Sequence, residues 1–311
     1  LVCLLFGSSV AFSQANSFPA RPITMLVHLA AGGATDVSIR VIAKAAEKYL
    51  GQTIVIQNTP GAGGAVALST LTKAKPDGYT LSTASGSALI TTPLLTKVEY
   101  DPLSDFVGVA QYAVFQEALA VHVDSQWKTW QDFWDYAREH PGMITYGTAG
   151  ASSVMHLVMA YAAKLEGARI THVPFDGGNP AFAAVLGRHV DAAFGAEFPS
   201  GVKEGKLRLL LMATNARLPQ YPDIPVPSEV GIEIPDVFSV GILAPKGTPT
   251  ERVQLLQDAF QKALSDPEVI TLLDRLAMVP MYQTGSEFIE ATRRSIEAIK
   301  PITSELDLSK K

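Results

Sequence analysis

The sequence predicts an α/β protein made of two domains that face each other. Short apolar runs alternate with segments of helical spacing, a pattern typical of parallel sheets covered by helices. The 311 residues suffice for two domains of ordinary size. One unit, an apolar strand followed by a small-residue loop and a helix start, occurs near residues 21–36 and again near 143–157. Two copies of this unit favour two similar domains.

The first unit begins with the apolar run 23–29, as expected for a buried parallel strand. Small residues then let the backbone turn, and Thr35 or Asp36 is expected to cap a helix that ends at Gly51. Backbone N–H groups and the positive end of the helix dipole meet at such a start, which suits an anion. The residues of this expected anion site are Ala31, Gly32, Gly33, Ala34, Thr35 and Asp36. An ordinary strand–helix connection is the alternative, because no glycine fingerprint of a nucleotide site occurs.

Two further strands, at 53–57 and 79–83, are expected in the first half, with a helix over 65–74 between them. The later strand ends in a small polar loop that contains Ser85 and Ser87. Ligands of open α/β sheets lie outside the carboxyl ends of the strands. This loop and the first one are therefore expected to line one crevice.

The second half repeats the alternation. Strands are expected at 118–123, 143–146, 169–173, 190–194, 207–213 and 238–244, and helices at 129–139, from 154, and at 182–186, 249–264, 267–276 and 286–299. The apolar face formed by Trp130, Phe133 and Trp134 is predicted to be core. The chain is expected to cross between the domains near 115–119 and 236–242, so that the last helices return to the first domain.

Composition limits the classes of partner. Hydrophobic residues make up 47% of the chain and charged residues 18%, which is typical of a globular protein. The net charge of −5 argues against a broad surface for nucleic acid or anionic membrane. It does not argue against a small anionic ligand, because a local group of N–H donors can bind an anion on an acidic protein.

Residues 1–15 resemble the later part of a secretory signal peptide. They are uncharged, and Ser13-Gln14-Ala15 fits the small-x-small pattern before a cleavage point. The segment is too short to span a bilayer, and a buried N-terminal strand or helix is the alternative. It contains Cys3, the only cysteine, so the mature chain is expected to have no disulfide. We therefore expect an exported protein that is not embedded in a membrane.

Histidine and serine spacing argues against metal or hydrolytic chemistry. None of the six histidines forms an H-x-x-x-H or H-x-H pair, and G-x-S-x-G does not occur. Ser152 or Ser153 with His156 would suit a hydrolase, but a helix cap and a core contact explain them, since no third orienting group is visible. Asp191 is expected to tie a strand end. We therefore expect no catalytic residue, no metal and no cofactor.

Eight segments, in order along the chain, resemble the substrate-binding proteins of tripartite tricarboxylate transporters, also called the Bug family. They are 19-PARPITMLVHLAAGGATDVSIR-40, 51-GQTIVIQNTPGAGG-64, 76-PDGYTL-81, 100-YDPLSDF-106, 146-YGTAGASSVMHL-157, 172-HVPFDGGNPA-181, 205-GKLRLL-210 and 243-LAPKGTP-249. Several motifs in order make this resemblance more specific than any single glycine loop.

The resemblance implies a periplasmic, two-lobed binding protein of the type II-like, Venus flytrap kind, with the ligand in the interlobe cleft. The first lobe would comprise residues 16–117 and 241–311, and the second lobe residues 118–240. Such proteins are not enzymes, and they hand a small solute, usually a carboxylate, to integral-membrane permease subunits. Loop N–H groups, hydroxyls and bridging waters hold the carboxylate in this family.

The resemblance also implies the ligand-binding residues, carried over by motif. The first lobe would contribute Ala31 to Asp36, with Ser85 and Ser87. The second lobe would contribute Thr148, Ala149, Ser152, Ser153, Phe175, Gly177 and Gly178, while Glu197 falls where the family selects the distal part of the ligand.

Some positions depart from the family pattern. His28-Leu29 stands where Pro-Phe is common, and Asp176 stands where lysine is usual. Because Glu197 is near Asp176 by motif order, a ligand with an amino group, or without a second carboxylate, becomes a reasonable expectation.

Other functions stay open at this point. A sensory protein that docks on a membrane sensor when loaded would use the same cleft. An exported hydrolase would need a nucleophile and a base that the sequence does not offer. A scaffold or adhesion protein would not need paired glycine and hydroxyl loops. The resemblance favours transport.

Overall fold

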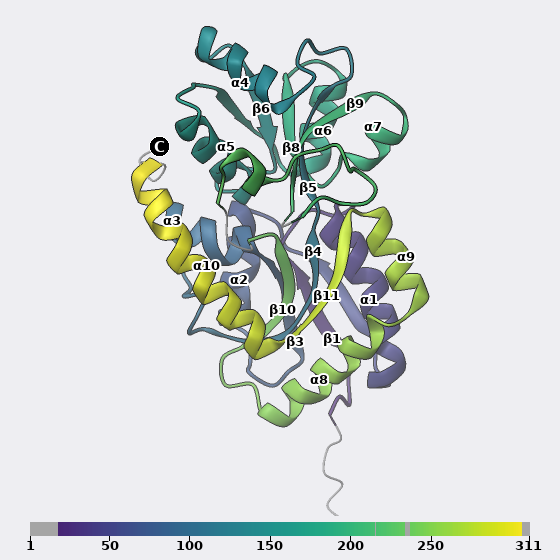
Figure 1. Cartoon of the computed structure of the whole chain (residues 1–311). Helices are drawn as coiled ribbons and strands as arrows, with labels where there is room; N and C mark the ends of the chain where they lie inside the picture. Colours follow the sequence, from purple (N-terminus) through teal and green to yellow (C-terminus); the bar gives the residue numbers. More distant parts are fainter. Residues whose placement is uncertain (1–17, 215, 234–236, 307–311) are drawn as a thin grey trace, which may run out of the picture.

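The computed structural model describes residues 18–214, 216–233 and 237–306, which form two α/β lobes (Figure 1). A six-stranded sheet has the order β11-β4-β10-β3-β1-β2, and a five-stranded sheet has the order β7-β6-β8-β5-β9. The predicted α/β, two-lobed fold is therefore confirmed. The predicted signal-peptide remnant, residues 1–15, lies outside the described residues.

The first lobe contains the larger sheet. Its strands are β1 (Ile23–Val27), β2 (Ile54–Asn58), β3 (Thr80–Ser85), β4 (Phe106–Phe115), β10 (Ser239–Pro245) and β11 (Met278–Thr284). Its helices are α1 (Ala34–Leu50), η1 (Ala62–Gly64), α2 (Ala65–Thr72), η2 (Ser87–Thr91), α3 (Thr92–Leu95), α8 (Thr250–Ala263), α9 (Pro267–Arg275) and α10 (Gly285–Leu306).

The second lobe contains the smaller sheet. Its strands are β5 (Glu117–His122), β6 (Thr145–Thr148), β7 (Thr171–Pro174), β8 (Ala192–Gly195) and β9 (Leu207–Ala213). Its helices are α4 (Trp130–Glu139), α5 (Val154–Leu165), α6 (Gly178–Leu186), α7 (Pro199–Lys203) and the short turn η3 (Pro227–Val230).

The strand directions turn the loops of the two lobes toward each other. The chain leaves the first sheet at the end of β4 and enters the second at β5, and it returns to the first sheet at β10. Strand β3 is antiparallel to β10 and parallel to β1, which is parallel to β2, so the carboxyl ends of β1, β2 and β3 point toward the second lobe. Strand β8 is antiparallel to β5 and parallel to β6, which is parallel to β7, so their carboxyl ends point toward the first lobe.

Apolar spacing explains the helices that cover the sheets. In α1, Ile39, Ile42 and Ala46 are fully buried, and Gly51 ends the helix in the left-handed conformation with its N–H on Glu47 O at 2.9 Å. In α4, Thr129 and Asp132 form a capping box. The aromatic face of α4 is buried with edge-on ring contacts, which confirms that it is core.

Helix α10 runs along the first lobe as far as α5 of the second (Figure 1). Its residues Phe288 and Ile299 share one hydrophobic cluster with Leu157 and Val158 of α5. The helix starts at Gly285, whose carbonyl oxygen lies 2.1 Å from where a Cβ on Gly108 would stand. This close approach of α10 to β4 therefore requires glycine.

The sequence pattern did not predict β4 or β11. Gly108, Gln111 and Tyr112 interrupt the apolar run of β4, although most of the strand is buried between β10 and β11. Strand β11 contains Pro280 and lies at the edge of the sheet, the place where a sheet tolerates proline. Strands β4 and β11 form because they pair with strands that are distant in the sequence.

Candidate functional site

The first loop of the site precedes α1, and its cap differs from the prediction. Gly33, not Thr35 or Asp36, occupies the N-cap position. Asp36 Oδ2 accepts the N–H of Gly32 at 2.9 Å, and Asp36 Oδ1 accepts from Arg40 Nε at 3.0 Å and from Asn58 Nδ2 at 2.8 Å. Burial opposes ionisation, but these hydrogen bonds hold the pKa of Asp36 below its usual value. Asp36 therefore fixes the shape of the loop.

The start of α1 keeps hydrogen-bond donors available for a ligand. The first N–H groups of a helix have no partner within the helix. Thr35 is 1% exposed, and its Oγ1 has no hydrogen-bond partner among the described residues. Buried hydroxyls are normally satisfied, so this one suits an added acceptor. Ala31 and Gly32 are exposed at the tip of the same loop.

His28 ties the first loop to the end of β3. Its Nδ1 lies 2.7 Å from Thr83 Oγ1, and its Nε2 lies 3.0 Å from Ser85 Oγ. The ring is fully buried, and burial lowers the pKa of His28 to about 4, although a hydrogen bond with Thr83 opposes this. A neutral imidazole thus positions the Ser85 hydroxyl at the carboxyl end of β3, which faces the second lobe.

The lobes touch through hydroxyl side chains and backbone groups that we call the interlobe contact: Gly63, Ser87, Thr91, Thr92, Ser152 and Val154. Ser87 Oγ accepts the N–H of Val154 at 3.2 Å. Thr91 Oγ1 donates to the carbonyl of Ser152 at 2.5 Å, and Thr92 Oγ1 donates to Ser152 Oγ at 3.1 Å. The predicted site residues Ser87 and Ser152 are thus brought together across the two lobes.

The loop after β6 is held by hydroxyl and imidazole contacts. Thr148 is fully buried, and its Oγ1 accepts from Ser153 Oγ at 3.0 Å and lies 2.8 Å from His172 Nε2. Ser153 caps α5, because its Oγ accepts the N–H of His156 at 3.2 Å. The predicted cap at Ser153 is confirmed. Ala149 lies half-buried in the same loop.

The loops after β7 and β8 meet at the start of α6. A Cβ on Gly147 would lie 2.9 Å from the Phe175 ring, so this ring packs against the end of β6. Gly177, with φ of 115°, is the N-cap of α6. A Cβ on Gly178 would stand 1.9 Å from Glu197 Oε2, so the Glu197 carboxyl lies against the first residue of the helix. Asp176 is exposed.

The sequence did not single out Glu117, or Thr91 and Thr92, which are the hydrogen-bond partners of Ser152. Glu117 is 4% exposed, and a polar residue at the start of the run 117–123, within the predicted crossing, was the available signal. The prediction that Asp191 ties a strand end is confirmed, because its Oδ2 accepts hydrogen bonds from the N–H and the hydroxyl of Thr145, both at 2.8 Å.

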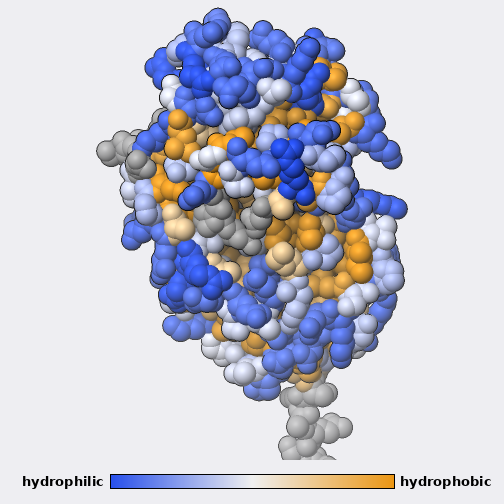
Figure 2. Space-filling model, viewed as in Figure 1, coloured by the Kyte–Doolittle hydropathy of each residue, from blue (hydrophilic) through white to orange (hydrophobic). Residues whose placement is uncertain are grey.

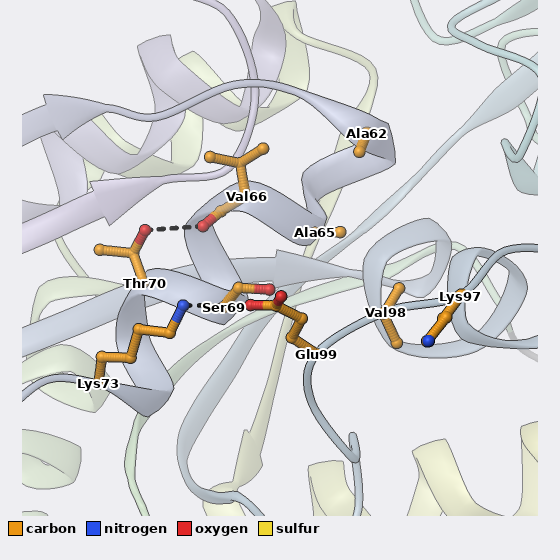
Figure 3. A pocket seen from close by; sticks show the side chains of 9 residues that line it. All are labelled: Ala62, Ala65, Val66, Ser69, Thr70, Lys73, Lys97, Val98 and Glu99. Carbon is orange, nitrogen blue, oxygen red and sulfur yellow. Dashed lines mark hydrogen bonds and ion pairs between the residues drawn. The ribbon is translucent and has the colours of Figure 1, made fainter.

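Two surface pockets lie away from these loops. One, of about 360 Å³, lies beside α2, where Lys73 pairs with Glu99 at 3.1 Å (Figure 3). It is lined by Ala62, Ala65, Val66, Ser69, Thr70, Lys73, Lys97, Val98 and Glu99. The other, of about 260 Å³, is lined by residues that include His122 and Asp191, at the opposite edge of the second sheet. Both ends of the Lys73–Glu99 pair are exposed, which is typical of a solvated surface, and neither pocket contains a predicted site residue.

Hydrophobic residues come to the surface around the waist between the lobes, while the outer ends are mainly hydrophilic (Figure 2). Within the described ranges, every helix is too short or too polar to cross a membrane. The same ranges hold no cluster of three or more metal-ligating side chains. The candidate site is therefore the set of loops that face each other at the waist.

Two lobes joined by crossing strands, with their loops facing each other, are the fold of periplasmic binding proteins such as BugD. The sequence model described as "Tripartite tricarboxylate transporter family receptor" matches residues 38–308, and the chain belongs to this family, TctC. The resemblance drawn from the motifs is confirmed. The family is one of solute-binding receptors and not of enzymes.

Known proteins agree with this assignment. The chain is 36% identical over 303 residues to the "UPF0065 protein in gbd 5'region" of Cupriavidus necator, covering 96% of this chain and 92% of that protein. MatC of Rhodopseudomonas palustris with bound malate is 29% identical, with a TM-score of 0.83 over 92% of this chain and 99% of that one. A second R. palustris protein, with adipate, is 26% identical, with a TM-score of 0.86 over 93% and 98%.

Proposed function

We propose that this protein captures a small carboxylate-containing solute in the periplasm and hands it to the integral-membrane permease subunits of a tripartite tricarboxylate-type transporter. Its placement there follows from cleavage of an N-terminal signal peptide. The start of α1 carries the proposal, because donor N–H groups meet there the buried hydroxyl of Thr35, which has no hydrogen-bond partner among the described residues. The carboxylates bound by the two R. palustris relatives support the same ligand class.

The site uses residues of both lobes. Ala31, Gly32, Gly33, Ala34, Thr35 and Asp36 form the first-lobe loop that receives the carboxylate. The predicted lobe boundaries, after residues 117 and 240, fall next to the crossings into β5 and β10, which supports a hinge at these strands. Closure about that hinge brings the second-lobe loops over the solute. The buried charge is then satisfied by N–H groups and bridging waters.

A thermal-shift screen tests this function. The protein is unfolded and refolded to remove co-purified solute, then mixed with dicarboxylates, tricarboxylates, aromatic carboxylates, amino acids and neutral sugars. A ligand at one hundred times its dissociation constant is expected to add roughly 2.7 kcal/mol of stability. We expect a shift with at least one carboxylate and none with the sugars. A shift with sugars alone would contradict the proposal.

Leucine at position 152 is expected to weaken binding without unfolding either lobe. A Cβ on Gly63 would lie only 2.6 Å from Ser152 Oγ, so a larger side chain at 152 keeps the lobes apart. We expect roughly a tenfold loss of affinity for the solute found in the screen, since overpacking costs about 1–3 kcal/mol. Ser152→Ala, which adds no volume and loses only the Oγ contact with Thr92, is the comparison and is expected to lose less affinity than Ser152→Leu. Unchanged affinity in folded Ser152→Leu would remove this residue from the site.

A further inference from the structure

Two glutamates meet at the edge of the second sheet that faces the first lobe. Glu117 is the first residue of β5, and Glu197 follows the end of β8 by two residues. Ala118 pairs with Gly195 in these neighbouring strands. A Cβ on Gly195 would lie 2.9 Å from Glu197 Oε2 and 3.8 Å from Glu117 Oε2. Both carboxyl groups therefore lie over the same glycine.

Among the residues that the structure describes, the two carboxyl groups have no positively charged partner. Glu117 is 4% exposed, and its Oε2 makes no hydrogen bond to any described residue. Within the described part of the chain, neither glutamate forms an ion pair with lysine, arginine or histidine. Burial, reinforced for Glu117 by the charge of Glu197, raises the pKa of both side chains. A buried carboxylate without a counter-charge is costly, so the pair suits an added cation.

The start of helix α6 gives a second reason to expect a cation near the two glutamates. This helix start is one of the places in the second lobe whose helix N–H groups suit a ligand carboxylate. The Glu197 carboxyl already lies there, since a Cβ on Gly178 would be 1.9 Å from Oε2 and 2.3 Å from Oε1. The second lobe thus presents negative charge to the cleft. The start of α1 in the first lobe presents donors instead.

We propose that Glu117 and Glu197 bind a protonated amine of the solute, so that the ligand is an amino-carboxylate whose carboxylate faces the first lobe. This inference rests on the proposed function and specifies the other end of its ligand. When the ammonium enters, it supplies the missing positive charge and both carboxyls ionise, so that a proton held by the raised pKa of Glu117 leaves to solvent. The ammonium itself stays protonated, so binding releases up to one proton.

Matched ligands test the proposal by isothermal calorimetry. The probes are β-alanine, γ-aminobutyrate and ε-aminocaproate, each against the dicarboxylate of equal carbon number (malonate, succinate, adipate) and the monocarboxylate (propionate, butyrate, caproate). At neutral pH, at least one amino acid is expected to bind roughly tenfold more tightly than both counterparts. Titration in two buffers of different ionisation enthalpy is expected to show proton release.

Glu117→Gln and Glu197→Gln extend the test, with thermal unfolding as the check on folding. Both are expected to lose roughly tenfold in affinity for the amino acid, and Glu117→Gln to lose the proton release. Glu204→Gln, an exposed glutamate of the same lobe paired with Lys206, is the control and should behave as wild type.

The outcomes separate the two proposals. Tight binding of a dicarboxylate, with no preference for the amino acid and no effect of either substitution, would overturn the amine site and leave the proposed function standing. Absence of binding by all three series and by every carboxylate of the thermal-shift screen would overturn both.

Discussion

Alanine at position 86 is expected to destabilise the protein by about 3 kcal/mol, at the upper end of the cost of overpacking a core. Gly86 has φ of −54° and ψ of −34°, a conformation open to alanine, so the backbone itself is not the obstacle. The obstacle is the chain that enters β10, because the new Cβ would lie 1.8 Å from Val237 O and 2.8 Å from its carbonyl carbon. The backbone at residue 86 and the chain that enters β10 must then move apart.

Urea unfolding measures this effect, with Gly33→Ala as the matched control. Gly33 has φ of −78°, and a Cβ there meets only Ala30 O, at 3.6 Å, which is ordinary contact. We expect the control to lose no more than about 1 kcal/mol, the cost of alanine in place of glycine at an N-cap. Ligand affinity should also fall in Gly86→Ala, because residue 86 leads into η2 and the interlobe contact. A wild-type unfolding midpoint for Gly86→Ala would show that the two segments do not pack this closely.

Acidification is expected to remove about 3 kcal/mol of stability through His28 alone. Its pKa is about 4 in the folded protein and 6.5 in the unfolded chain. The unfolded chain therefore binds the proton first as the pH falls. The contribution of neutral His28 is fully present above pH 6.5 and is lost as the pH falls toward 4. The slope cannot exceed about 1.4 kcal/mol per pH unit for one group.

The variant His28→Gln isolates this effect, since glutamine hydrogen-bonds without titrating. Glu117 and Glu197 act in the opposite direction, because their raised pKa values add stability at acid pH that is lost as the pH rises. The measurement is therefore the difference between wild type and His28→Gln, taken from urea unfolding at several pH values. We expect the free energy of unfolding of the variant to lack the loss between pH 6.5 and 4. Parallel curves for the two proteins would contradict a buried, neutral His28.

Local patterns in the sequence predicted most of the framework. The run into Gly32-Gly33, the aromatic face of α4 and the cap at Ser153 each depend on neighbours within a few residues, so spacing alone reveals them. Motifs in order along the chain also predicted the family, which the comparison confirmed. The ligand-binding residues and the lobe boundaries stay predictions that the binding experiments test.

Tertiary structure decided what distant residues do together. Strand β4 depends on pairing with β10 and β11, and Ser152 reaches Thr92 only because the carboxyl edges of the two sheets face each other. Glu117 meets Glu197 through the register of β5 on β8. By itself, the sequence determined the strand–loop–helix units, because periodicity and capping act locally, and the resemblance of its ordered motifs to a known family gave the class of the protein. The meeting of Glu117 and Glu197 was decided by the fold, because it depends on contacts between strands far apart in the chain.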